Sequence, residues 1–263
     1  MKTALCYSGQ INGFREAIGT QQDSYYMSDM NIYAVFSNLI SQRVNLHPKY
    51  PHSGKVHQYC PANIGWRKNQ SDYGIIYDAC LLPKKIVTEN LKKYNPVLEE
   101  IHEDLKESLE DKNLDRKWDW LRKRQLYKMY KCNSLLPENT YDVVIRSRYE
   151  FAPSGKINIQ NIVEQYDNID NKIFLFGGWD CVPPMIFMDK YMCDGFAFGS
   201  QKSMNVFTSL YLQEDPYPYD PKYEECWLKY GDNVEYQLEQ HLKANNIEIV
   251  YIGNKRSMYH NWR

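Results

Sequence analysis

The chain has 263 residues, with 32 basic against 33 acidic side chains, a net charge of -1 and 43% apolar residues. This length allows one large domain or two small ones, and the apolar share is large enough to build a core, which excludes a disordered protein. The balanced charge argues against a general nucleic-acid binder, because such proteins carry an excess of Lys and Arg. We therefore expect a globular protein that has no nucleic-acid partner.

Residues 3–8 form a short apolar run, which predicts a first strand, and the sequence SGQING (residues 8–13) follows it as a glycine-bearing turn that leads into a helix. Residues 31–36 predict a second strand. A strand, a helix and a strand at this spacing indicate a βαβ unit and therefore an α/β sheet. Residues 45–83 then crowd Pro, His, Gly, Tyr and Asn together, which predicts a long surface loop or insertion.

Leu98, Ile101, Leu105 and Leu109 follow the 3.6-residue period and predict a helix. A second helix is expected over residues 118–131, with the charges of both helices on solvated faces. Residues 141–145 are the continuous apolar run typical of a central buried strand. The later expected elements are strands at 173–176 and 195–199, a helix over 232–244 that places His241 on its surface, and a strand at 248–252.

Two arginines and a glutamate, Arg146, Arg148 and Glu150, follow this buried strand at alternate positions. Side chains of a strand alternate, so we expect these three on one face. Charged groups beside a buried strand are costly unless they are paired or bind a ligand. In open α/β sheets, ligands bind outside the carboxyl ends of the strands, and arginine is well suited to phosphate. The alternative is a structural ion-pair cluster.

Ser8, Gly9 and Gln10 follow the first strand. A glycine at this point lets backbone amides approach a phosphate, although an ordinary tight turn explains the pattern equally well. Asp194 begins the sequence DGFAFGS, and Glu235 lies in the first turn of a predicted helix. Each carboxylate is a candidate functional group, with a turn residue or a helix-dipole partner as the alternative.

The histidines form no metal array, and the seven cysteines form no CxxC pair. This argues against a structural zinc site and predicts reduced, mostly buried thiols. The N-terminal residues contain no apolar stretch of signal-peptide length, and no run of about 18 apolar residues occurs. We therefore expect no membrane span and a cytoplasmic location.

These motifs in this order resemble a family of uncharacterised glycosyltransferase-like proteins of bacteria, plants and large DNA viruses. The segments that carry the resemblance are the Ser-Gly-Gln turn, YDVVIRSRYE (141–150), DGFAFGS (194–200) and the late acidic helix. The usual central motif of that family is Arg-x-Arg-x-Asp after a buried strand, and its members are thought to adopt the GT-A fold. The resemblance covers most of the chain apart from residues 45–83.

The resemblance implies an α/β fold: one GT-A-like domain over residues 1–263, with a mixed, mostly parallel central sheet flanked by helices. Residues 1–150, with the loop insertion at about 45–83, would bind a nucleotide sugar, either a UDP- or a GDP-sugar. Residues 151–263 would bind a glycan or another hydroxyl acceptor. The implied function is transfer of the sugar to that acceptor in glycan biosynthesis.

The implied donor-binding residues are Ser8, Gly9, Gln10, Arg15, Arg146, Arg148 and Glu150. Asp194 and Glu235 are the candidates for the catalytic base. Glu150 and His260 would hold Mn²⁺ or Mg²⁺. The Asp-x-Asp motif that usually binds the metal is absent, with Arg148 at its first position. A metal-independent enzyme is therefore the alternative, in which Arg148 neutralises the diphosphate.

Three rival functions are weighed against transfer. A nucleotidyltransferase requires a glycine-rich loop with a basic residue close behind the first strand. The residues after Gln10 do not provide one. A Rossmann methyltransferase requires a GxGxG-like loop after the first strand, and this sequence has none there. A catalytically decayed transferase fold that acts as a carbohydrate-binding or scaffold protein is the main alternative, and the absence of Asp-x-Asp is its best support.

Overall fold

A computed structural model of the chain describes the backbone of residues 1–10, 30–37, 39–45, 66–70, 75–81, 98–102, 117–148, 157–178, 191–213, 217–218 and 234–254. The helices are α4 (Lys117–Ser134), α5 (Ile159–Val163), α6 (Gln201–Ser209), η4 (Leu210–Leu212) and α8 (Val234–Ala244). The strands are β1 (Thr3–Gln10), β2 (Met30–Ser37), β3 (Leu39–Asn45), β4 (Trp66–Gln70), β5 (Ile75–Leu81), β6 (Leu98–His102), β7 (Val143–Ser147), β8 (Lys172–Gly178), β9 (Tyr191–Gly199) and β10 (Glu248–Asn254).

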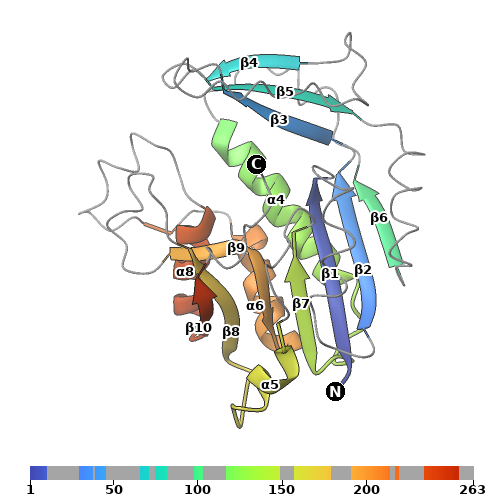
Figure 1. Cartoon of the computed structure of the whole chain (residues 1–263), viewed down its shortest axis with the longest axis vertical. Coiled ribbons are helices and arrows are strands. Elements are labelled where there is room, and N and C mark those ends of the chain that lie inside the picture. The colour runs from blue at the N-terminus through green and yellow to red at the C-terminus, as the bar shows by residue number, and fades with distance from the viewer. Residues whose placement is uncertain are drawn as a thin grey trace.

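The main sheet has seven strands in the order β10-β8-β9-β7-β1-β2-β6 (Figure 1). Among these described strands, β9 runs antiparallel to both of its neighbours, while the other pairs are parallel. The predicted α/β class with a mixed, mostly parallel sheet is therefore confirmed. The sheet takes strands from both halves of the chain, β1, β2, β6 and β7 from residues 1–150 and β8, β9 and β10 from residues 151–263.

Helices α4, α6 and α8 pack on one face of this sheet. Their buried residues, such as Met129, Met204 and Leu238, form a core cluster with Cys6 and Val144 of the strands. The opposite face carries an aromatic layer in which Phe174 and Phe198 stack with ring centroids 4.9 Å apart. The central strands β1 and β7 are buried on both faces, which explains why their sequences are continuous apolar runs.

A second, three-stranded antiparallel sheet has the order β3-β5-β4. A single residue separates the end of β2 from the start of β3. Figure 1 shows the small sheet beyond the carboxyl ends of β1 and β2. Strands β4 and β5 lie within residues 45–83, so the prediction of a loop there is wrong for these segments. Strand β5 contains Ile75, Ile76 and Tyr77, which are β-branched or aromatic residues that favour strands.

The helix predicted from Leu98 onward is also corrected. Residues Leu98–His102 form β6, which pairs in parallel with β2 and places Ile101 opposite Phe36. Leu and Glu favour helices, but pairing with a neighbouring strand overrides such weak local preferences. The remainder of that predicted helix, residues 103–109, lies outside the described residues.

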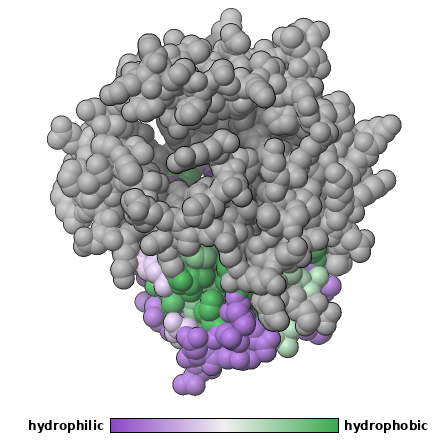
Figure 2. Space-filling model, viewed as in Figure 1, coloured by the Kyte–Doolittle hydropathy of each residue, from purple (hydrophilic) through white to green (hydrophobic). Residues whose placement is uncertain are grey.

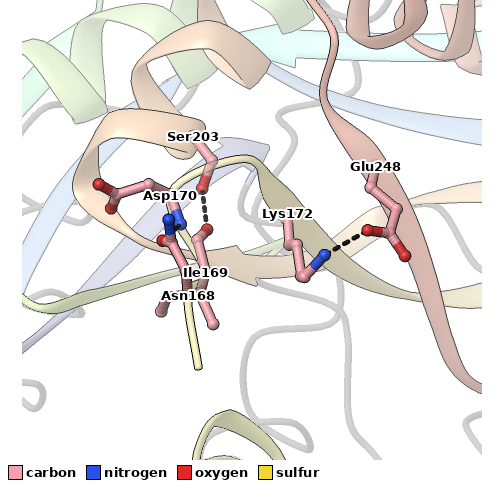
Figure 3. Close-up of polar contacts among 6 residues, drawn as sticks. All are labelled: Asn168, Ile169, Asp170, Lys172, Ser203 and Glu248. Carbon is pink, nitrogen blue, oxygen red and sulfur yellow. Dashed lines mark hydrogen bonds and ion pairs between the residues drawn. The ribbon is translucent and has the colours of Figure 1, made fainter. Parts of the chain in front are cut away.

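Polar contacts fix the amino edge of the main sheet, where the parallel strands begin. The amide of Asp170 donates to Asn168 Oδ1 at 2.8 Å, and Lys172 forms an ion pair with Glu248 across β8 and β10 (Figure 3). Ser203 Oγ donates to the carbonyl of Ile169 at 3.5 Å, which connects α6 to the same edge. Figure 2 shows hydrophilic residues gathered at this end of the molecule, around α5.

His241 was predicted to lie on a helix surface, but it is buried between α8 and α6. Its Nε2 lies 3.0 Å from the carbonyl oxygen of Val206, which can only accept a hydrogen bond, so Nε2 carries the proton. Nδ1 then accepts a hydrogen bond from the Tyr217 hydroxyl at 3.0 Å. The neutral ring thus satisfies both of its nitrogens inside the core, which explains why a histidine is tolerated there.

We expect stability to fall as the pH is lowered below 6.5. Burial lowers the pKa of His241 from 6.5, and the bond to Val206 offsets this only in part. At a pH between the pKa values of His241 in the folded and the unfolded chain, the unfolded chain binds a proton that the folded chain does not. The free energy of unfolding therefore decreases by at most about 1.4 kcal/mol per pH unit. Urea unfolding between pH 5 and 7.5 measures this slope.

The matched variant is His241→Gln, which cannot titrate in this range. Its free energy of unfolding at pH 7.5 is expected to be lower than that of the wild type, since the bonds of the ring are lost, but its pH slope should be smaller. An equal slope in both proteins would show that His241 is not the titrating group.

Candidate functional site

The main sheet has a topological switch point between β1 and β7. From β1 the chain builds outward through β2 to β6, and it then returns to the other side of β1 to form β7. Because β1 and β7 are parallel, their carboxyl ends lie side by side, with Tyr7 paired to Ser147. The strand order therefore changes direction between β1 and β7, and such a point is where open α/β sheets bind ligands.

The carboxyl end of β1 consists of Ser8, Gly9 and Gln10. Gly9 has a φ of 141°, a backbone conformation that side-chain-bearing residues rarely adopt. Among the described residues, no atom lies within 4 Å of the place that a Cβ on Gly9 would occupy. The turn predicted to begin at Ser8 is therefore corrected: β1 continues through Gln10, in register with β2, and Gly9 is a strand residue whose side-chain position is empty among the described residues.

The carboxyl end of β7 carries the two arginines, but the structure separates their surroundings. Arg146 is 2% exposed, whereas Arg148, which follows the last residue of β7, is half-buried. The amide of Arg148 donates to the carbonyl of Gly195 in β9 at 2.8 Å, which continues the ladder between β7 and β9. The backbone of Arg148 is thus held at the carboxyl edge of the sheet by β9.

Both candidate bases lie toward the same edge of the sheet. Asp194 is in β9, next to the glycine that bonds Arg148, although its side chain lies outside the described residues. Helix α8 ends where β10 begins, at the amino edge, since the amide of Glu248 donates to the carbonyl of Asn171. Eleven residues span about 16 Å, so the first turn with Glu235 lies toward the carboxyl edge.

Three predicted site residues, Arg15, Glu150 and His260, lie outside the described residues, as does the side chain of Gln10. The prediction that Arg146, Arg148 and Glu150 share one face of the strand therefore concerns, among the described residues, only the two arginines. Within the part of the chain that the structure describes, no group of three His, Cys, Asp or Glu side chains could hold a metal ion.

Sequence reasoning missed Lys128 on α4. The sequence predicts that the charges of this helix lie on solvated faces, but Lys128 is 3% exposed. A signal was present, because Lys128 stands seven residues after Leu121 and four before Cys132, on the apolar stripe of the helix.

Two free thiols, Cys6 and Cys132, lie near Arg146. Cys132 Sγ donates to the carbonyl of Tyr7 at 3.4 Å, and both Cys6 and Cys132 are buried. Burial raises the pKa of the Cys132 thiol, a hydrogen bond with Cys6 raises it further, and the guanidinium of Arg146 opposes these effects in part. The prediction of reduced, buried thiols is confirmed for these two cysteines.

No family model matches the chain, and no curated protein matches it closely enough to be counted as a relative. None of the described helices has the length and apolar character needed to cross a membrane. The described residues define an α/β protein in which Gly9 of β1 and the half-buried Arg148 after β7 lie at the same edge of the sheet, at a topological switch point.

Proposed function

We propose that this chain is a glycosyltransferase with a GT-A-like fold, which moves a sugar from a UDP- or GDP-sugar to a hydroxyl acceptor. The observation that carries the proposal is the meeting of Gly9 and Arg148 at one switch point. These residues are far apart in the sequence, and adjacent parallel strands bring them together there. A glycine and a guanidinium at the carboxyl edge of a sheet suit a nucleoside diphosphate, because the glycine lets a ligand approach the backbone and the guanidinium pairs with phosphate.

Sugar transfer has two electrostatic requirements. The bond from the sugar to the diphosphate breaks, so negative charge develops on the leaving oxygen and must be stabilised. Arg148 supplies a positive charge at the switch point, with its backbone fixed by the bond to Gly195. For an inverting reaction, a carboxylate must also accept the proton of the acceptor hydroxyl. Asp194 and Glu235, both toward the same edge of the sheet, are the proposed bases.

A divalent cation would be held by Glu150 and His260, which both lie outside the described residues. The charged residues described at the end of β7, Arg146 and Arg148, are by contrast cationic. They suit the diphosphate directly and would repel a metal ion. The proposal therefore assigns charge neutralisation to the arginines and routes no step through a metal.

A panel of UDP- and GDP-sugars, with and without Mn²⁺, tests the proposed function. A ligand that binds the folded chain raises its melting temperature, so one member of the panel should do so. That donor should also be hydrolysed slowly, or transferred when glycan acceptors are added. Binding without turnover would favour the alternative, a decayed transferase fold that binds carbohydrate. If no nucleotide sugar binds, the proposal is wrong.

Substitution distinguishes the two candidate bases. In Asp194→Asn and Glu235→Gln, we expect the variant of the true base to lose about 10²- to 10⁴-fold in transfer rate, because general base catalysis contributes that much. Its donor affinity should stay within about twofold, since the base faces the acceptor. Donor binding by calorimetry and initial rates of transfer are measured on both variants. Full transfer activity in both would remove both residues from the mechanism.

A further inference from the structure

Cys6 of β1 and Cys132 of α4 meet in the core, where the helix packs directly on the strand. Both thiols are free, and both are buried. The thiol of Cys132 has a hydrogen bond with that of Cys6, and it donates to the carbonyl of Tyr7, the next residue of β1, at 3.4 Å. Two cysteines that are far apart in the sequence thus place their sulfur atoms in contact.

This contact is the starting geometry of a disulfide. Sulfur atoms in hydrogen-bond contact have to approach by only about 2 Å to reach the S–S bond length of about 2.05 Å. A lone buried cysteine packs as a small apolar side chain, whereas two thiols in contact can also be joined by oxidation. The guanidinium of Arg146 favours the thiolate of Cys132, which is the form that reacts, and so opposes the effect of burial in part.

We propose that Cys6 and Cys132 form a reversible redox pair, which hydrogen peroxide converts into a disulfide that ties α4 to β1. One thiol, as its thiolate, attacks an oxygen of the peroxide, so the O–O bond breaks, the sulfur becomes a sulfenic acid and water leaves. The other thiol attacks that sulfur, its proton goes to the departing oxygen, and a second water leaves. The two thiols lose the two electrons that the peroxide gains, and a thiol reductant reverses the bond by exchange.

The burial of the pair determines how fast it reacts. Burial raises the pKa of Cys132, so little thiolate is present while α4 stays packed on β1. Local opening of the helix exposes both thiols, and oxidation then proceeds through the open form. We therefore expect slow oxidation that a low concentration of urea, below the unfolding transition, accelerates. A pair of this kind responds to sustained oxidising conditions and stays reduced during brief ones.

A peptide map of the oxidised chain tests the pairing. The reduced full-length chain is incubated with hydrogen peroxide, its remaining thiols are alkylated in denaturant, and it is digested without reduction. We expect a linked pair of peptides that contains Cys6 and Cys132 and is lighter than the two reduced peptides by two hydrogen atoms. Alkylation of both cysteines in the treated chain, or their linkage to other cysteines instead, would overturn the proposal.

The melting temperature gives a second readout. A disulfide that closes a long loop restricts the unfolded chain, so the oxidised wild type is expected to melt about 5 °C or more above the reduced one. Dithiothreitol should reverse this rise. Cys132→Ala lacks one partner and should show no rise on oxidation. Cys80→Ala is the matched control, because Cys80 belongs to β5 of the second sheet and the variant keeps the pair, so its rise should equal that of the wild type.

The two readouts separate the bond from its effect. A linked peptide without a rise in melting temperature would show that the disulfide does not hold α4 on β1. An equal rise in Cys132→Ala would assign the effect to another cysteine. If Cys132→Ala does not fold, the peptide map of the wild type decides. The inference depends on the two thiols alone, so it is independent of the outcome of the nucleotide-sugar panel.

Discussion

Replacing Arg148 by alanine is expected to weaken donor binding by about 10- to 100-fold. A hydrogen bond to a charged group contributes about 1.5–3 kcal/mol, which corresponds to that range of dissociation constants. Arg148 is half-buried, and its backbone stays anchored by the bond to Gly195 O in the variant. Calorimetry with the donor identified in the nucleotide-sugar panel measures the affinity.

The conservative variant Arg148→Lys sharpens this test. Lysine keeps the positive charge but loses the planar fork that donates two hydrogen bonds to a phosphate. We expect its donor affinity to lie between those of the wild type and Arg148→Ala, and Lys202→Gln, which alters an exposed lysine of α6, serves as the control. Donor affinity that is unchanged in Arg148→Ala would show that this arginine does not face the donor.

That the two motifs lie at the same edge of the sheet could be predicted from the sequence. The run Ala4-Leu5-Cys6-Tyr7 and the run Val143-Val144-Ile145 lack a polar face, which is how strands buried on both sides of a parallel sheet look. Parallel strands end at the same edge, so residues just after two such runs lie at one edge of the sheet. The sequence does not determine that β7 returns beside β1, because strand order depends on the whole chain.

Elements whose pairing overrides local preference could not be predicted. A segment such as Leu98–His102 has helix-favouring residues and becomes a strand because β2 offers an unpaired edge. The burial of Lys128 and His241 likewise depends on tertiary packing, which for His241 includes the Tyr217 hydroxyl. Polar residues are assigned to the surface by default, and only the packed structure shows which of them have partners inside.

The two edges of the sheet differ in chemistry, and this difference separates stability from function. At the amino edge, polar groups pair with each other, as Lys172 does with Glu248 and as Gln201 does with the amides of Thr140 and Tyr141. At the carboxyl edge, Gly9 borders open space and Ser8 Oγ has no partner among the described residues. Substitutions at the first edge should change folding, and those at the second should change binding.

Gly199→Ala at the amino edge is therefore expected to lower stability and to leave donor affinity unchanged. A Cβ on Gly199 would lie 2.6 Å from Ser203 Oγ and 2.7 Å from the carbonyl oxygen of Lys172. Figure 3 shows Lys172 and Ser203 at this edge. The Lys172 oxygen is backbone and cannot move without displacing β8 from β9. Overpacking of this kind costs about 1–3 kcal/mol, and urea unfolding measures it.

The double variant Gly199→Ala/Ser203→Ala tests this cause. Removing Ser203 Oγ relieves the nearer contact but leaves the clash with the Lys172 carbonyl, so the double variant should recover only part of the loss. The cost of Gly199→Ala in free energy of unfolding is compared between the wild type and the Ser203→Ala background. The difference between these two costs measures the steric contact with Ser203 Oγ. Wild-type stability in Gly199→Ala would mean that β8 and β9 separate easily at this edge. Reduced stability with unchanged donor affinity would confirm that this edge holds the fold while the opposite edge binds the ligand.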